Sequence, residues 1–257
     1  MAEFDRPTVA AGAGSAAVVD QGLRSYLLRV YNYMAVGLVV TGLVAYFVYA
    51  AATTTDTANA VAQVGNGLYL TSFGAAIYTS ALRYVVIFAP LAFVLVLSFG
   101  IQRMSAAAAQ LAFWAFAAVM GLSLSSIFLT YTGTSIARTF FISAATFGAM
   151  SLFGYTTRRD LSGFGSFLLM GLIGIIIASI VNIWLASSAL SFGISILGVL
   201  IFVGLTAYDT QRIKLGYSSS FGSDVLQKSA IMGALSLYLD FINLFLMLLR
   251  LTGSQRN

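Results

Sequence analysis

The sequence SAIMGALSLYLDFINLFLMLLR, residues 229–250, is apolar over most of its length and carries one acidic residue, Asp240. The hydrocarbon core of a bilayer is about 30 Å thick and a helix rises about 1.5 Å per residue, so about 20 mostly apolar residues span it. Residues 229–250 meet this requirement. They predict a membrane-spanning helix with a carboxyl group near its middle.

Six earlier segments have similar length and polarity, at approximately residues 31–52, 84–102, 107–131, 139–156, 165–187 and 191–212. The composition agrees, because 60% of the residues are hydrophobic and 8% are charged, where soluble domains carry roughly 25% charged residues. We therefore predict an all-α membrane protein with seven transmembrane helices. It comprises an N-terminal segment (residues 1–30), a seven-helix membrane domain (residues 31–252) and a C-terminal tail (residues 253–257).

The basic residues predict the orientation, since cytoplasmic loops carry an excess of Lys and Arg. With the N-terminus inside, the inner segments hold Arg6, Arg24, Arg29, Arg103, Arg158, Arg159, Arg212, Lys214 and Lys228. The outer segments hold Arg83, Arg138, Arg250 and Arg256. This imbalance predicts a cytoplasmic N-terminus and an external C-terminus. The first residues show no transit-peptide pattern, Arg29 precedes the first span and the loops are short, which together favour a bacterial inner membrane.

The basic residues are scattered over four loops, so they predict contact with anionic lipid and no nucleic-acid binding.

The chain has no His and no Cys. This excludes Ser-His and Cys-His nucleophiles, thiolate and imidazole metal sites, haem and disulfides. The longest polar connection, residues 53–83, contains an apolar patch at residues 68–78 that is too short to cross and is expected at the interface.

Two acidic residues lie inside predicted spans, where a carboxylate costs roughly 2.5–3.5 kcal/mol on insertion scales. They are Asp209, near the inner end of the sixth span, and Asp240 in the seventh. The remaining acids fall in predicted loops and need no special reason: Glu3, Asp5, Asp20, Asp56, Asp160 and Asp224. The two membrane carboxylates are therefore the candidate functional residues.

Each of these aspartates lies on a face of small or polar residues spaced three and four apart, the spacing of one helix face. The seventh span presents Gly233, Ser236, Asp240 and Asn243, and the sixth presents Ser195, Gly198, Phe202, Thr206 and Asp209. The short connection, residues 213–228, predicts that these two helices are antiparallel neighbours. Straight helices would leave the carboxyls one or two turns apart, unless the seventh begins near Asp224 or breaks near Gly233.

If the carboxyls meet in a dry interior, they cannot both ionise cheaply, and the pair titrates as a unit. A shared proton would hold the two helices together at lower pH. Deprotonation would set two negative charges against each other and admit a cation. The alternative is that either Asp simply hydrogen-bonds neighbouring helices, as polar residues do in membrane bundles, or that Asp209 pairs with Arg212.

Three motifs together resemble the bacterial branch of the Bax inhibitor motif family. They are Thr206-Ala-Tyr-Asp-Thr-Gln211, Leu237-Tyr-Leu-Asp-Phe-Ile-Asn-Leu-Phe245 and Arg29-Val-Tyr-Asn-Tyr-Met34. The resemblance extends over residues 20–253. It implies a seven-helix fold whose final helix is central and wrapped by the other six, and a pH-sensitive calcium leak.

By motif position, the resemblance implies a pH sensor and gate formed by Asp209 and Asp240, with Arg103 as a candidate counter-ion of Asp209. A tight calcium site takes six to eight oxygens with several carboxylates, and two aspartates supply too few. Calcium therefore fits as a permeant ion and not as a cofactor. The two aspartates would hold it weakly and transiently, with Thr206, Ser236 and Asn243 as candidate pore-lining residues.

Two other functions stay open. One is a non-transporting membrane protein that binds a partner and modulates a membrane protease or stress response. The more remote one is an intramembrane aspartyl protease, which also carries Tyr-Asp in one span and Asp in the next. That class requires Gly-x-Gly-Asp and a downstream Pro-Ala-Leu, whereas no glycine adjoins Asp240 and the prolines are Pro7 and Pro90. We therefore expect that the chain is not an enzyme.

Overall fold

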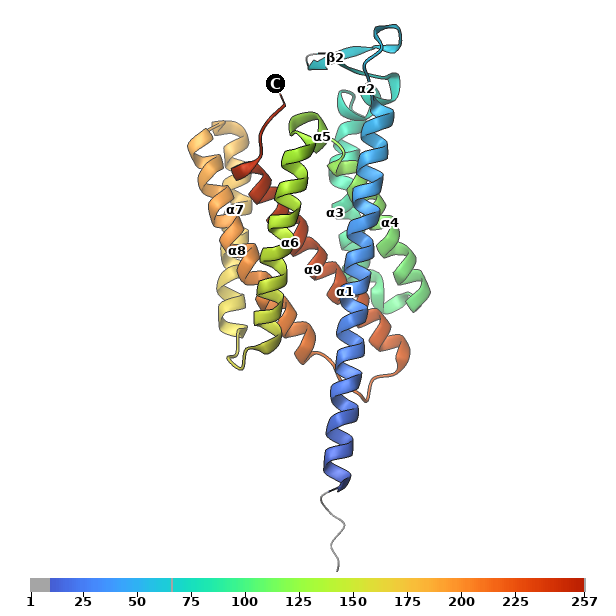
Figure 1. The fold of residues 1–257 in the computed structure, drawn as a ribbon, viewed down its shortest axis with the longest axis vertical. Helices are drawn as coiled ribbons and strands as arrows, with labels where there is room; N and C mark the ends of the chain where they lie inside the picture. Colours follow the sequence, from blue (N-terminus) through green and yellow to red (C-terminus); the bar gives the residue numbers. More distant parts are fainter. Residues whose placement is uncertain (1–9, 66, 257) are drawn as a thin grey trace, which may run out of the picture.

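The computed structural model describes residues 10–65 and 67–256, and it is mostly helical (Figure 1). The α-helices are α1 (Ala10–Ala52), α2 (Ser72–Tyr78), α3 (Leu82–Gly100), α4 (Ala106–Leu124), α5 (Ile127–Thr130), α6 (Gly133–Thr156), α7 (Ser162–Leu185), α8 (Ser188–Leu215) and α9 (Ser223–Thr252). Two 3₁₀ turns are η1 (Thr57–Asn59) and η2 (Ile101–Arg103). Seven of the helical segments are long and apolar enough to cross a membrane, which confirms the predicted class.

The seven spans match the seven predicted runs, and most of the helices extend beyond them. Side-chain hydroxyls fix several of the helix starts: Ser105, Thr132 and Ser187 each accept a backbone N–H bond from the residue three positions later. α1 begins at Ala10, inside the segment predicted to precede the membrane domain. α9 begins at Ser223, six residues before the apolar run.

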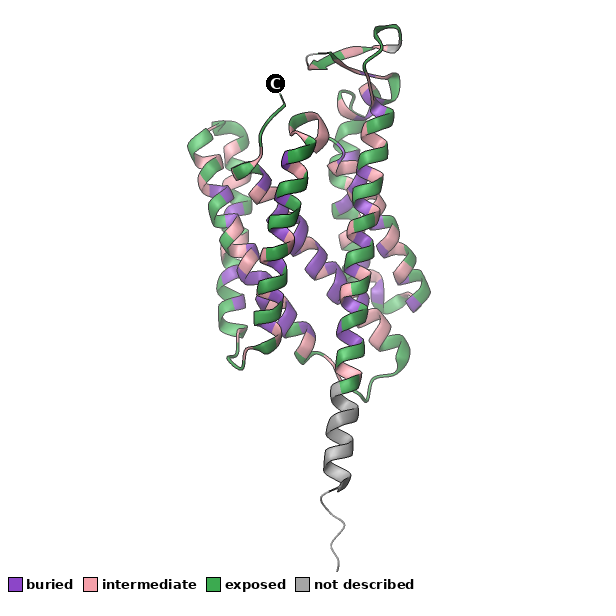
Figure 2. Cartoon of the chain, in the orientation of Figure 1, coloured by how far each residue is buried: buried purple, intermediate pink, exposed green. Residues whose placement is uncertain are grey.

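α9 occupies the interior of the bundle and is the most buried of the seven spans. It runs obliquely between the other helices (Figure 2). Most of its own buried residues lie in its middle. It packs against α1, α4, α6 and α8, whereas α3 packs mainly on α4 and α7 mainly on α8. The final helix is therefore internal, and four of the six helices predicted to wrap it form its main contacts.

The outward faces of the helices are apolar. α3 and α7 expose large side chains such as Phe88 and Phe99 on α3 and Ile183 and Trp184 on α7. In water such a surface would be unfavourable, but it matches the acyl chains of a bilayer. This exposure agrees with a multi-pass membrane protein.

The connection between α1 and α3 folds into a small antiparallel sheet that the sequence did not predict. Its strands are β1 (Thr53–Thr54), β2 (Ala62–Gly65) and β3 (Leu68–Leu70), in the order β1-β3-β2. β3 and α2 form the apolar patch predicted to be too short to cross the membrane, and neither is among the segments long enough to span one. Their placement at the interface stays a prediction.

The C-terminal residues lie beside the turn between α5 and α6, at the same end of the molecule as the sheet (Figure 1). Ser254 donates its backbone N–H to the Ser135 hydroxyl at 2.9 Å and accepts from Thr132 N–H at 3.1 Å. Arg256 N–H donates to the Thr130 carbonyl at 2.8 Å. These bonds join the end of α9 to the loop that precedes α6.

Candidate functional site

α8 and α9 cross closely because small residues lie at their contact. A Cβ atom on Gly198 would lie 2.8 Å from the Met247 side chain, and one on Gly233 would lie 3.3 Å from the Ile213 side chain. Because α9 begins at Ser223 and runs obliquely, Asp240 reaches the depth of Asp209 without a break at Gly233. The first of the two predicted routes, an early start of the seventh helix, is the one that the fold uses.

The carboxyl groups of Asp209 and Asp240 lie within hydrogen-bonding reach of each other. Asp240 is 5% exposed, and its Oδ2 atom meets no donor among the described residues. Two carboxylates repel, but one carboxyl and one carboxylate form a short, charge-assisted bond. The fold therefore brings the two membrane carboxyls together at the contact between α8 and α9.

The charged partner of Asp209 is Arg212, one helical turn further along α8. Its Nη2 atom lies 3.5 Å from Asp209 Oδ1 and donates a hydrogen bond to the Ser236 hydroxyl on α9 at 3.2 Å. The Arg212 side chain is 55% exposed and that of Asp209 is 13% exposed, so the ion pair lies at the edge of the buried site. Arg212 thus contacts both helices that carry the carboxyls.

Arg103, the candidate counter-ion, lies elsewhere. It ends η2 after α3, where it is exposed, and it makes no ion pair within residues 10–65 and 67–256. In this conformation the counter-ion position belongs to Arg212. The physical reason is spacing: residues three apart on a helix face each other, whereas Arg103 would have to cross from another helix.

The three candidate pore-lining residues divide into two groups. The Thr206 hydroxyl donates to the Phe202 carbonyl at 2.7 Å, and the Asn243 amide donates to the Leu239 carbonyl at 2.8 Å. Both bonds reach back one turn in the same helix. Ser236 is the one whose side chain joins the charged cluster, because its hydroxyl accepts from Arg212.

Sequence reasoning missed a buried polar contact beside Asp240. The hydroxyls of Tyr238 on α9 and Thr41 on α1 lie 2.6 Å apart, and Thr41 also lies 2.8 Å from the Ala117 carbonyl of α4. Tyr238 is fully buried and packs its ring edge-to-face against Phe113 and Phe116. The position of Tyr238 two residues before Asp240 was the available signal, since a buried phenol requires a partner.

An apolar cavity of about 100 Å³ is lined by α1, α5, α6 and the C-terminal half of α9. Its lining includes Phe241, Ile242 and Phe245 of α9, and Phe140 of α6 stacks edge-to-face on Phe241 at 5.5 Å between ring centroids. Thr41 supplies a polar group to the wall. A passage from the carboxyl pair toward that end of the bundle would therefore meet a mostly hydrophobic region.

The described residues contain no group of three or more acidic, His or Cys side chains that could hold a metal ion. Two carboxylates supply fewer oxygens than the six to eight of a stable calcium site.

Comparison with known proteins gives one family match and three relatives that agree with it. Residues 23–257 match the family described as inhibitor of apoptosis-promoting Bax1. An uncharacterized protein of Rickettsia prowazekii is 49% identical over 238 residues, covering 93% of each chain. The inner membrane protein YbhL of Escherichia coli K12 is 48% identical over 238 residues, covering 91% of this chain and 94% of that protein. An uncharacterized membrane protein of Streptococcus pyogenes is 36% identical over 234 residues, covering 91% and 94%.

Proposed function

The chain belongs to the Bax inhibitor family, and from this premise we propose that it is a pH-sensitive cation leak channel that conducts calcium. The observation that carries the proposal is the position of Asp209 and Asp240, whose carboxyls lie within hydrogen-bonding reach on two different helices. The inner-membrane name of the relative YbhL supports an inner-membrane location. The basic-residue count supports a cytoplasmic N-terminus.

The gate works through the number of protons on the pair. With one proton, the carboxyl and carboxylate bind each other and keep α8 and α9 together. When the pH rises and that proton leaves, two negative charges face each other in a region of low dielectric. The helices then separate or the pair accepts a cation. Flux is therefore expected to increase with pH.

Calcium is proposed as the permeant ion because it binds carboxylate oxygens and its charge would compensate both aspartates. Two carboxylates with Ser236 nearby make a weak site, and weak binding lets an ion leave as readily as it arrives. The apolar cavity beside Phe241 and Ile242 supports a closed state, since a hydrophobic constriction gates by excluding water.

The test is calcium flux into vesicles that contain the purified protein, measured from pH 5 to pH 8. We expect flux to rise with pH in the natural protein and to lose its pH dependence in Asp240→Asn. Asp160→Asn is the matched control. Asp160 is fully exposed in the α6–α7 loop, and hydrogen bonds from Ser162 lower its pKa, so it is charged over the whole range and should not affect the profile.

An unchanged pH profile in Asp240→Asn would overturn the gate. Absence of calcium flux at every pH, together with loss of a bound membrane protein in the aspartate variants, would favour the non-transporting interaction protein. That the chain is not an enzyme stays a prediction.

A further inference from the structure

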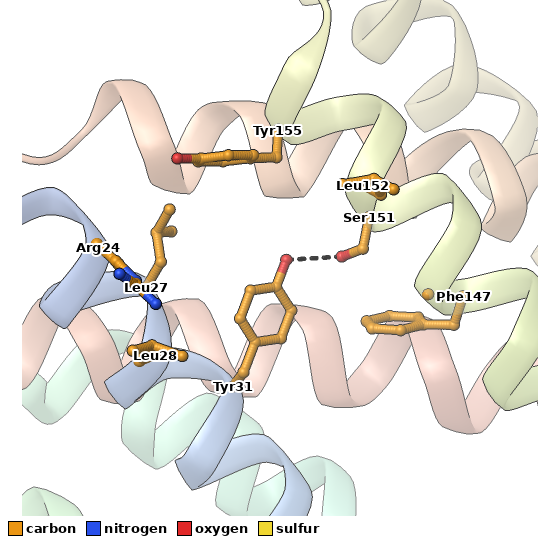
Figure 3. A pocket seen from close by; sticks show the side chains of 9 residues that line it. Arg24, Leu27, Leu28, Tyr31, Phe147, Ser151, Leu152 and Tyr155 are labelled. Atoms are coloured by element: carbon orange, nitrogen blue, oxygen red, sulfur yellow. Dashed lines mark hydrogen bonds between the residues drawn. The ribbon is translucent and has the colours of Figure 1, made fainter. Parts of the chain in front are cut away.

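A second cavity, of about 480 Å³, lies between α1 and α6 (Figure 3). Its size falls within the roughly 300–1,000 Å³ of small-molecule sites. Four apolar side chains form most of its wall: Leu27 and Leu28 from α1, and Phe147 and Leu152 from α6. The proposed gate does not use this cavity.

The polar groups of the cavity are few and lie at defined places. The hydroxyls of Tyr31 and Ser151 point toward each other across the cavity and lie 2.7 Å apart (Figure 3). Ser151 also lies 2.9 Å from the Thr210 hydroxyl of α8, which closes the inner side. Among the side chains that the structure describes, Arg24 is the one charged residue in the lining, and it is exposed.

Further positive charge lies near the Tyr155 end of the cavity. Lys214 donates a hydrogen bond from Nζ to the Tyr155 carbonyl at 2.7 Å, and Nζ lies 5.0 Å from the centre of the Tyr155 ring. Arg158 and Arg159 follow the end of α6 directly and are exposed. The surroundings of the cavity are therefore cationic at one end.

Arg24 precedes the apolar run at residues 31–52 by seven residues, about 10 Å along α1, so it lies at the level of lipid headgroups. The cavity walls continue from there along the apolar part of α1 and α6, at the level of acyl chains. A ligand that fits both regions has an anionic head and a long apolar tail.

We propose that this groove binds one acidic phospholipid of the bilayer, with its phosphate at Arg24 and an acyl chain against Leu28, Phe147 and Leu152. Arginine is well suited to phosphate because its planar guanidinium can donate two parallel hydrogen bonds. The apolar wall disfavours a free phosphate ion, which would gain nothing from it. The positive charge of Arg24 favours an anionic head over a cationic one.

Gly148 allows the groove to be filled without disturbing the fold. It lines the cavity, and a Cβ atom built on it would meet nothing within 4 Å. Gly148→Leu therefore places a side chain in the space assigned to the acyl chain. The matched control is Gly174→Leu on α7, which is also open and exposed but lies outside the groove.

The experiment uses the full chain in phosphatidylcholine vesicles that contain phosphatidylglycerol with a photoreactive acyl chain. Cross-linked peptides are identified by mass spectrometry. We expect labelling of α1 and α6 around Leu28 and Leu152, reduced at least about fivefold by Gly148→Leu and unchanged by Gly174→Leu. Photoreactive phosphatidylcholine should label these peptides about fivefold less than phosphatidylglycerol, the ratio that one basic residue near a membrane surface provides.

Charge variants separate the groove from the general surface potential. Arg24→Gln should lower phosphatidylglycerol labelling, whereas Arg29→Gln removes the same charge from another side of α1 and should not. Equal losses in both variants would overturn the proposal, as would equal labelling by the two lipids. Competition by millimolar inorganic phosphate would assign the site to a soluble phosphate instead. None of these readouts depends on calcium flux, so the groove and the gate fail independently.

Discussion

Arg212 of α8 donates a hydrogen bond to the hydroxyl of Ser236 of α9 at 3.2 Å. The same guanidinium lies 3.5 Å from Asp209. One exposed side chain thus binds both helices of the carboxyl pair and supplies the positive charge beside it. The pair is therefore coupled to a residue that solvent and salt can reach.

Arg212→Gln should move the pH at which flux is half-maximal upward, because the nearby positive charge favours the ionised pair. The shift should be about one pH unit or less, since an ion pair with an exposed partner is worth about 1 kcal/mol or less. Arg212→Lys keeps the charge and should shift the midpoint less. A midpoint that is unchanged in Arg212→Gln would show that the guanidinium does not act on the gate.

Ile242→Thr should raise the calcium flux at low pH, where the gate is closed. Ile242 is buried and lines the apolar cavity between α1, α6 and α9, so a hydroxyl there would admit water to the hydrophobic region. Ile242→Val is the control, since valine has nearly the shape of threonine without the hydroxyl. If the two variants leak equally, loss of volume and not wetting is responsible.

Gly154→Ala should destabilise the contact between α6 and α8. A Cβ atom on Gly154 would lie 2.2 Å from the Ala207 carbonyl oxygen, so the helices must move apart. We expect a loss of about 1–3 kcal/mol in the free energy of unfolding, the usual effect of overpacking. Thermal unfolding in detergent measures it. Gly148→Ala, on the same helix in open space, should be neutral or slightly stabilising.

Truncation after Gly253 should lower the unfolding temperature. It removes the bonds that Ser254 makes with Thr132 and Ser135 and the bond of Arg256 with Thr130. Each is worth roughly 0.5–1.5 kcal/mol. Ser135→Ala removes one of them and should have a smaller effect. An unfolding temperature that the truncation does not change would mean that the tail contributes nothing to stability.

Single-cysteine variants should establish the orientation, because the natural chain has no cysteine. Ser219, between α8 and α9, and Thr55, after β1, are both exposed. With a cytoplasmic N-terminus, a membrane-impermeant maleimide added to whole cells that have a permeable outer envelope should label Thr55→Cys and not Ser219→Cys. The reverse pattern would invert the predicted topology.

Most of the fold follows from hydrophobic length, which is why all seven spans could be predicted. The helix periodicity also placed Asp209 and Asp240 on facing stripes, and the structure brings them together. Their relative depth could not be predicted, since it depends on the tilt of α9 and on the six residues that precede its apolar run. Tilt is set by packing against neighbouring helices, and no local pattern encodes it.

The remaining differences arise from contacts between distant residues. In the small sheet, Thr53 of β1 and Ala62 of β2 both pair with Leu70 of β3. Strands this short and polar show little hydrophobic periodicity, so the sequence did not predict them. Arg212 and Arg103 are both near the ends of spans, and only the coordinates distinguish which one lies beside Asp209. The groove between α1 and α6 joins residues more than a hundred positions apart.

The position of α9 has a consequence for biosynthesis. The segment that fills the middle of the bundle is the last of the seven spans in chain order, so it leaves the ribosome after the other six. Until it is inserted, α1, α4, α6 and α8 lack their common packing partner, and α8 must hold a carboxyl in lipid without the second one. Assembly is therefore completed only after translation of the final helix, and a nascent chain that stops early should be a substrate for membrane quality control.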